Sequence, residues 1–132
     1  MTPQDALDQA ITERMARFRY IAGEPGGRLD YWDQPAEVEA RGGADCDGLT
    51  IWCLWRASQL CPAGCYWFVR GTVQGQGHAW AEIRMAGQAR IWADPTGGRH
   101  CTTPEWFEAW CPVKGYPWTD GILGPPTDYM EE

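Results

Sequence analysis

Apolar side chains return every three or four residues over the first part of the chain, which predicts an amphipathic helix. The repeat consists of Leu7, Ala10, Ile11, Met15, Phe18 and Ile21. Thr2 and Pro3 precede it as an N-cap and a proline at the first helical position. Because the glycine- and proline-rich segment 23–27 ends the pattern, we expect a helix over residues 1–22.

A second helix is predicted from Cys46 to about Leu60, directly after the Gly42-Gly43 break. Its apolar residues extend beyond one stripe, so we expect it to be buried on most sides. They are Leu49, Ile51, Trp52, Cys53, Leu54, Trp55 and Leu60. A short helical turn is expected over residues 35–40.

The following segments alternate or carry aromatic and β-branched residues, which is typical of strands. We expect a strand over residues 66–69, a polar loop over 71–77, and a hairpin that joins strands 78–85 and 89–93. A short helix over 104–110 and a largely irregular tail over 115–132 complete the pattern. Helices that precede an antiparallel run of strands predict an α+β fold in one domain, 1–132, with its core over about 31–98.

Charge and hydrophobicity exclude some classes of function. The formal net charge of −7 argues against nonspecific binding to nucleic acid or to an anionic membrane, both of which need basic surface. No apolar run approaches the roughly 20 residues that span a bilayer. The first residues lack the basic start and apolar core of a signal peptide, so we expect a cytoplasmic protein, or one incorporated from there into a particle.

Six cysteines leave two structural interpretations open besides catalysis. Cys61 and Cys65 are separated by three residues, a spacing found in zinc sites, and His100, Cys101 and Cys111 follow later. No second cysteine pair of matching spacing follows. A single disulfide among these cysteines is the other interpretation.

Three short segments carry the candidate chemistry: residues 43–50 around Cys46, 77–80 around His78 and 94–96 around Asp94. Cys46 follows two glycines and opens a helix, where unpaired N–H groups and the helix dipole favour a thiolate. The same N–H groups can stabilise an oxyanion. The carboxylates of Asp45 and Asp47 oppose the thiolate, and Asp45 is a candidate N-cap.

His78 and Asp94 are predicted to lie at the same end of a hairpin, because His78 begins one strand and Asp94 ends its antiparallel partner. An imidazole can take the thiol proton, and a carboxylate can fix its tautomer and orientation. The pattern therefore predicts a cysteine nucleophile enzyme with Cys46, His78 and Asp94 as its triad. A free cysteine is otherwise a small core residue, and an isolated Asp-Pro is otherwise a turn.

At these residues the chain resembles the transglutaminase-like superfamily of papain-type cysteine enzymes, and within it the small bacterial transglutaminase-like cysteine peptidases. The resemblance rests on the three segments in this order, covers roughly residues 31–98, and extends to Tyr31-Trp32-Asp33-Gln34-Pro35 before the cysteine. It implies a cysteine-bearing helix packed on a small antiparallel sheet that carries the histidine and the aspartate.

The resemblance also implies a function. Cys46 would be the nucleophile, His78 the general base and then acid, and Asp94 the orienting group. Such enzymes attack a peptide or carboxamide carbonyl, pass through a thioester, transfer the acyl group to water or an amine, and need no cofactor. An upstream donor that completes the oxyanion hole would be Trp32 or Gln34, although Trp32 equally suits a packing role. Asp47 and Gly77 are further candidates for substrate binding.

A second hypothesis is a non-catalytic module of the same fold, for example a structural component of a phage-type particle. The two hypotheses differ in the expected reactivity of Cys46. The sequence leaves open the substrate, the choice between water and amine as acyl acceptor, and the oligomeric state.

Overall fold

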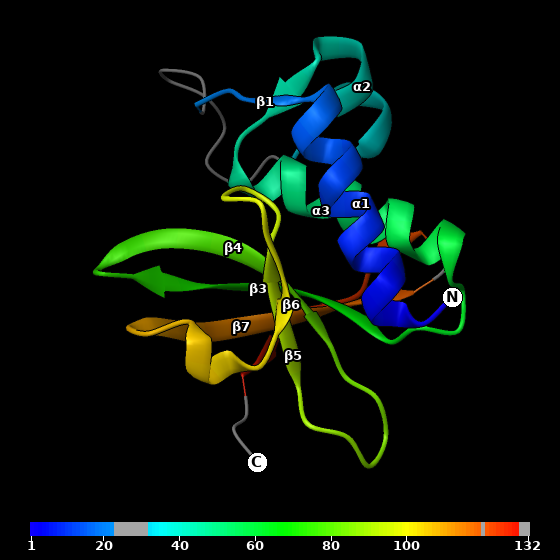
Figure 1. Ribbon diagram of the computed structural model, residues 1–132. Helices are drawn as coiled ribbons and strands as arrows, with labels where there is room; N and C mark the ends of the chain where they lie inside the picture. The colour runs from blue at the N-terminus through cyan, green and yellow to red at the C-terminus, as the bar shows by residue number, and fades with distance from the viewer. Residues whose placement is uncertain (23–31, 120, 130–132) are drawn as a thin grey trace.

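The computed structural model describes residues 1–22, 32–119 and 121–129, which form helices packed against a curved antiparallel sheet (Figure 1). The order of the main sheet is β6-β5-β4-β3-β7-β8, and β9 also pairs with β7. Its strands are β3 (Tyr66–Val73), β4 (Gln76–Ile83), β5 (Ile91–Asp94), β6 (Arg99–Thr102), β7 (Trp110–Thr119), β8 (Ile122–Leu123) and β9 (Thr127–Asp128). Three helices precede this sheet in the described residues, so the predicted α+β class is confirmed.

Helix α1 (Pro3–Arg17) begins as predicted and ends earlier than predicted. The Thr2 hydroxyl accepts from the Asp5 N–H at 3.1 Å, and the Asp5 carboxylate accepts from the Thr2 N–H. The expected helix to residue 22 is wrong because the chain becomes extended at Phe18, whose buried ring packs 4.9 Å from that of Trp52. The next residues form β1 (Arg19–Tyr20), which runs parallel to β2 (Gly43–Ala44).

Helix α3 (Cys46–Leu60) has the predicted bounds and is buried along most of its first three turns. It packs on α1, on β3 and on β4, so it lies between the N-terminal helix and the sheet (Figure 1). The short α2 (Pro35–Arg41) precedes it and ends at Gly42, which adopts a left-handed conformation with φ of 76°. The glycine break before α3 is therefore the C-cap of α2.

Alternation along the strands divides the buried side chains between the two faces of the sheet. Phe68, Ala79, Ala81 and Ala93 pack with α1 and α3 in the main core, which also includes Leu7, Ile11 and Trp118. The opposite face holds a second cluster of Val69, Trp80, Trp92 and Phe107. The main core thus includes residues of α1 and of β7, and Tyr31 lies outside the described residues.

The predicted loop over residues 71–77 is wrong, because β3 continues to Val73 and β4 begins at Gln76. Gln74 and Gly75 alone form the turn, with φ of 52° and 80°. Two positive φ values match the twist of the flanking strands, which explains how a polar, glycine-rich sequence forms a tight hairpin.

The C-terminal segments also depart from prediction. The helix expected over 104–110 is a single 3-10 turn, Pro104–Trp106, and Trp110 begins β7. Instead of an irregular tail, β7 pairs with β3 from Trp110 to Pro117, with a bulge at Arg70/Gly71. A Cβ on Gly71 would lie 2.1 Å from the Cys111 carbonyl oxygen, so only glycine lets the two strands approach here. In the described residues, no helix has the length and apolar content needed to cross a membrane.

Candidate active site

Cys46 is the first residue of α3, as predicted, and its side chain is half-buried. Asp45 is the N-cap and accepts a hydrogen bond from the Gly48 N–H at 3.1 Å. A Cβ on Gly48 would lie 2.5 Å from that of Ala44, so this glycine lets the first turn of α3 pack against β2. The local sequence therefore presents the thiol at a helix N-terminus, where first-turn N–H groups have no partner within the helix.

His78 and Asp94 are brought together as the hairpin predicted. His78 Nε2 lies 3.2 Å from Asp94 Oδ1, and Asp94 is the last residue of β5. The Asp94 carboxylate is buried and accepts from the Thr96 and Gly97 N–H groups, both at 3.2 Å. The turn after β5 thus fixes the carboxylate, which in turn fixes the imidazole.

The His78 imidazole interacts with both Asp94 and Cys46. Burial lowers its pKa, but the hydrogen bonds to Asp94 and Cys46 and the negative charges of both groups raise the pKa to about 9. Because Nε2 is engaged with Asp94, Nδ1 is the ring nitrogen available to the thiol. Thr50 links α3 to β4, since its hydroxyl donates to the carbonyl of Ala79, the residue after His78, at 3.5 Å.

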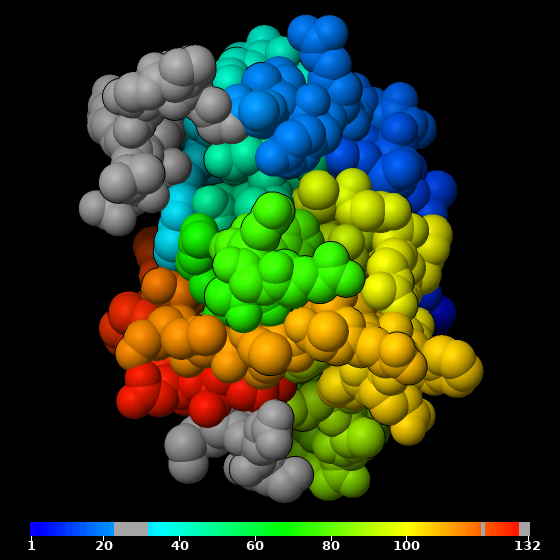
Figure 2. Space-filling model, turned by 90° about the vertical axis from the view of Figure 1, so that its left-hand side faces the viewer, coloured from blue at the N-terminus to red at the C-terminus, as the bar shows by residue number. Residues whose placement is uncertain are grey.

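Aromatic rings and an open cleft surround the imidazole. The ring of Trp110 meets that of His78 edge-on with centroids 5.3 Å apart, and the ring of Trp80 stacks on it at 6.2 Å. A cleft of about 300 Å³ adjoins His78 and is lined by Val73, Gln74, Gln76, Gly77, His78 and Trp110. Figure 2 shows this side of the molecule, with the green β3–β4 turn protruding at the centre and the orange β7 below it.

The four residues predicted to bind substrate or complete the oxyanion hole lie in different places: Trp32, Gln34, Asp47 and Gly77. Gly77 lines the cleft, and Asp47 is paired with Arg70 at 2.6 Å. The Trp32 ring packs between those of Phe68, at 4.8 Å, and Tyr116, at 5.1 Å.

Gln34 is exposed at the N-cap of α2. Its side-chain amide donates to the Trp32 carbonyl at 3.1 Å. One of the two N–H donors of this amide is therefore used within its own segment, whereas the packing role foreseen for Trp32 is observed.

Two further residues lie at the site that the sequence pattern did not indicate. Arg70 is a charged residue in an otherwise apolar, aromatic strand, and that contrast was the available signal. Trp110 carried none, because it reaches His78 only through the pairing of β7 with β3.

The alternative metal and disulfide interpretations concerned Cys61, Cys65, His100, Cys101 and Cys111. All six cysteines are free in the structure. Nε2 of His100 lies 3.0 Å from the Thr12 hydroxyl. Within residues 1–22, 32–119 and 121–129, no group of three or more His, Cys, Asp or Glu side chains is placed to hold a metal ion.

The fold is similar to that of solved structures of LapG from Legionella pneumophila. One matches with a TM-score of 0.71 and 17% identity, covering 93% of this chain and 68% of LapG. The calcium-bound structure matches with a TM-score of 0.69 and 15% identity over 91% and 70% of the two chains. The EGTA-treated structure matches with a TM-score of 0.69 and 17% identity over 90% and 69%.

No protein-family model matches the sequence, and the search of curated proteins finds no match. At this level of identity the structural matches establish the fold. The chain has the transglutaminase-like fold of LapG, with the cysteine-bearing helix α3 on a small antiparallel sheet.

Proposed function

We propose that this protein is a cysteine hydrolase that cleaves peptide or carboxamide bonds through a thioester. The observation that carries the proposal is the pair of His78 with Asp94 at 3.2 Å, together with the effect of Cys46, at the N-terminus of α3, on the pKa of His78. The transglutaminase-like cysteine protease fold shared with LapG supports the same chemistry. Its substrate would then be a protein or peptide.

In the proposed mechanism, the Cys46 thiolate attacks the substrate carbonyl carbon, and the carbonyl oxygen becomes an oxyanion. The N–H groups of the first turn of α3 are the proposed donors to that oxyanion. The His78 imidazolium then donates its proton to the departing nitrogen as the tetrahedral intermediate collapses to the thioester. Neutral His78 next takes a proton from water, which attacks the thioester and releases the acid and the thiolate.

Water is the proposed acyl acceptor because the cleft at His78 opens to solvent. Gly77 has no side chain to obstruct this cleft, so a substrate segment would pass over it between the β3–β4 turn and Trp110. This assigns Gly77 and Trp110 to substrate binding.

Calcium requires separate treatment, because one of the matched LapG structures is calcium-bound. Calcium is bound by six to eight oxygen ligands, usually including several carboxylates. Near Cys46, the Asp45 carboxylate caps α3 and the Asp47 carboxylate is paired with Arg70. This donor set does not fit a calcium site, and no step of the mechanism uses a metal.

The test is incubation with peptide libraries, with and without a primary amine, followed by mass spectrometry. We expect cleavage products that carry a free carboxylate. Cys46→Ser should abolish them, and Asp94→Asn should slow turnover by about 10⁴-fold, because the wrong histidine tautomer is then favoured. Amine adducts without acid products would contradict hydrolysis, and no product with either mixture would favour the non-catalytic module.

A further inference from the structure

Two carboxylates flank the proposed nucleophile, and this arrangement presents an electrostatic problem. Asp45 and Asp47 are the immediate neighbours of Cys46, and the Asp33 carboxylate lies 3.6 Å from where a Cβ on Gly48 would be. Negative charges close to a thiol disfavour its ionisation. A site that works through a thiolate therefore needs positive charge that offsets these carboxylates.

Arg70 supplies positive charge to one of these carboxylates, that of Asp47. It projects from β3, and its Nη1 lies 2.6 Å from Asp47 Oδ1. Its guanidinium also lies over the Trp32 ring, 5.8 Å from the centroid. The pair is largely shielded, with 32% of the Arg70 side chain and 13% of the Asp47 side chain exposed, so their attraction is less screened than at the surface.

The other two carboxylates also have partners within the chain. Asp45 accepts from the Gly48 N–H, which directs its charge at the positive end of the α3 dipole. Asp33 is paired with Arg41 at 2.7 Å. The charges around Cys46 are thus balanced by groups of the protein, whereas the similar LapG fold has been solved with calcium bound.

We infer that Arg70 is a built-in counter-cation that keeps the Cys46 site reactive without a divalent metal ion. Arg70 acts through Asp47 and is a positioning residue, since its ion pair offsets the charge of the carboxylate next to Cys46 in the chain. The inference rests on the proposed role of Cys46 as nucleophile. It goes beyond that role by assigning Arg70 a task and by predicting independence of calcium.

The experiment measures the rate at which iodoacetamide alkylates Cys46, with exposed Cys65 as the reference thiol in the same molecule. This rate reports thiolate at Cys46 and needs no substrate. In the wild-type protein we expect the same rate after EGTA treatment as after addition of CaCl₂. Slower alkylation in EGTA, restored by CaCl₂, would overturn the inference.

Three variants test the role of Arg70 itself. Below neutral pH, Arg70→Met should slow Cys46 alkylation by about tenfold, because the charge of Asp47 then opposes formation of the thiolate without a cationic partner. Arg70→Lys should retain most of the rate, because it keeps the charge. Adding Asp47→Asn to Arg70→Met should restore the rate, since the carboxylate that Arg70 offsets is then neutral.

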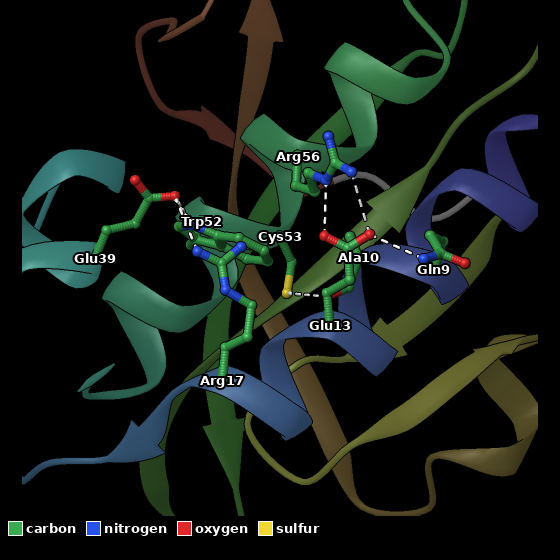
Figure 3. Close-up of polar contacts among 8 residues, drawn as sticks. All are labelled: Gln9, Ala10, Glu13, Arg17, Glu39, Trp52, Cys53 and Arg56. Carbon is green, nitrogen blue, oxygen red and sulfur yellow. Dashed lines mark hydrogen bonds and ion pairs between the residues drawn. The ribbon is translucent and has the colours of Figure 1, made fainter. Parts of the chain in front are cut away.

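The matched control is Arg56→Met. Arg56 is paired with Glu13 at 2.8 Å with similar exposure, 31% and 19%, and the pair lies between α3 and α1 (Figure 3). Its loss should lower stability and leave Cys46 alkylation unchanged. A general loss of packing would slow alkylation in both single variants and would not be reversed by Asp47→Asn, which would overturn the inference.

The alkylation results test the role of Arg70 independently of the peptide-cleavage results, which test the proposed function. If peptides are not cleaved but the alkylation results are as expected, the hydrolase proposal fails and the role of Arg70 stands. If peptides are cleaved but Arg70→Met alkylates at the wild-type rate, the role of Arg70 is wrong and the hydrolase proposal stands.

Discussion

His78 is paired with Asp94, and both Asp94 and Cys46 raise its pKa. Its pKa of about 9 means that the imidazole is protonated at neutral pH. A protonated imidazole beside a thiolate is the resting state expected of a cysteine nucleophile, because each ion stabilises the other. The two predictions at this scale concern the proton on His78.

The first prediction is that Cys46→Ala lowers the pKa of His78 from about 9 toward the ordinary histidine value. The variant removes one hydrogen bond and one negative charge that raise this pKa. NMR titration of the imidazole signals measures it, and His100→Gln assigns the signals, because the chain has two histidines. An unchanged pKa in Cys46→Ala would show that the thiol does not interact with the ring.

The second prediction concerns the pH dependence of peptide cleavage. As pH rises through about 9, His78 loses its proton, so the thiolate loses its cationic partner and the departing nitrogen loses its proton donor. The value of kcat/KM should therefore fall above pH 9 and remain level through the neutral range. Asp94→Asn should shift this alkaline decline to lower pH, since the Asp94 hydrogen bond and charge raise the His78 pKa. A decline at the same pH in both proteins would contradict the assignment.

At the scale of single elements, the N-terminus of α3 determines where the thiol is presented. Asp45 caps this helix through the Gly48 N–H, and Thr2 caps α1 in the same way through the Asp5 N–H. The two caps are chemically alike, but only Asp45 lies beside Cys46. They form a matched pair for separating helix stability from reactivity.

The third prediction is that Asp45→Ala lowers the free energy of unfolding by about 1 kcal/mol, because an unpaired N–H is left at the helix start. Asp45→Asn should cost less, since asparagine also caps. Thr2→Ala should also lower the free energy of unfolding by about 1 kcal/mol, and it should leave Cys46 alkylation unchanged. Urea denaturation and alkylation kinetics measure the two effects. An Asp45→Asn variant as unstable as Asp45→Ala would indicate that the charge, rather than the cap, stabilises α3.

Local signals in the sequence were sufficient for the elements that local interactions decide. The start of α1, both ends of α3 and the β4–β5 hairpin follow from caps, glycine breaks and periodicity, and these were predicted correctly. The pairing of His78 with Asp94 followed from the same hairpin. Their chemical roles remain proposals.

Long-range pairing decided the elements that the sequence did not reveal. The proline, glycine and acidic residues after position 115 suggested an irregular tail, but β7 holds Pro112 and Pro117 in register with β3, opposite Gly71 and Trp67. The end of α1 is likewise set by the pairing of β1 with β2, which lie more than 20 residues apart in the chain. Arg70 and Trp110 could not be assigned to the site without this register.

Considered as a whole, the molecule buries apolar side chains on both faces of the sheet. Helices α1 and α3 cover one face, and the C-terminal residues close the other around the fully buried Glu82 of β4. The Glu82 carboxylate accepts from the Trp92 indole N–H and the Tyr129 hydroxyl, both at 2.5 Å, and pairs with Arg84. Tyr129, the residue after β9, is thus hydrogen-bonded to β4, the strand that carries His78.

The final prediction is that Tyr129→Phe lowers the free energy of unfolding by about 1–3 kcal/mol, because a buried carboxylate oxygen loses a donor. Phenylalanine keeps the ring, which lies 6.4 Å from that of Trp92, so the variant isolates the hydrogen bond from the packing. Lys114→Ala is the control, since it breaks an exposed pair with Asp128 on the same strands and should leave stability nearly unchanged. Urea denaturation compares the two variants with the wild type. Equal stability of Tyr129→Phe and wild type would mean that Tyr129 covers the sheet without stabilising Glu82, whose remaining partners, Trp92 and Arg84, would then be sufficient.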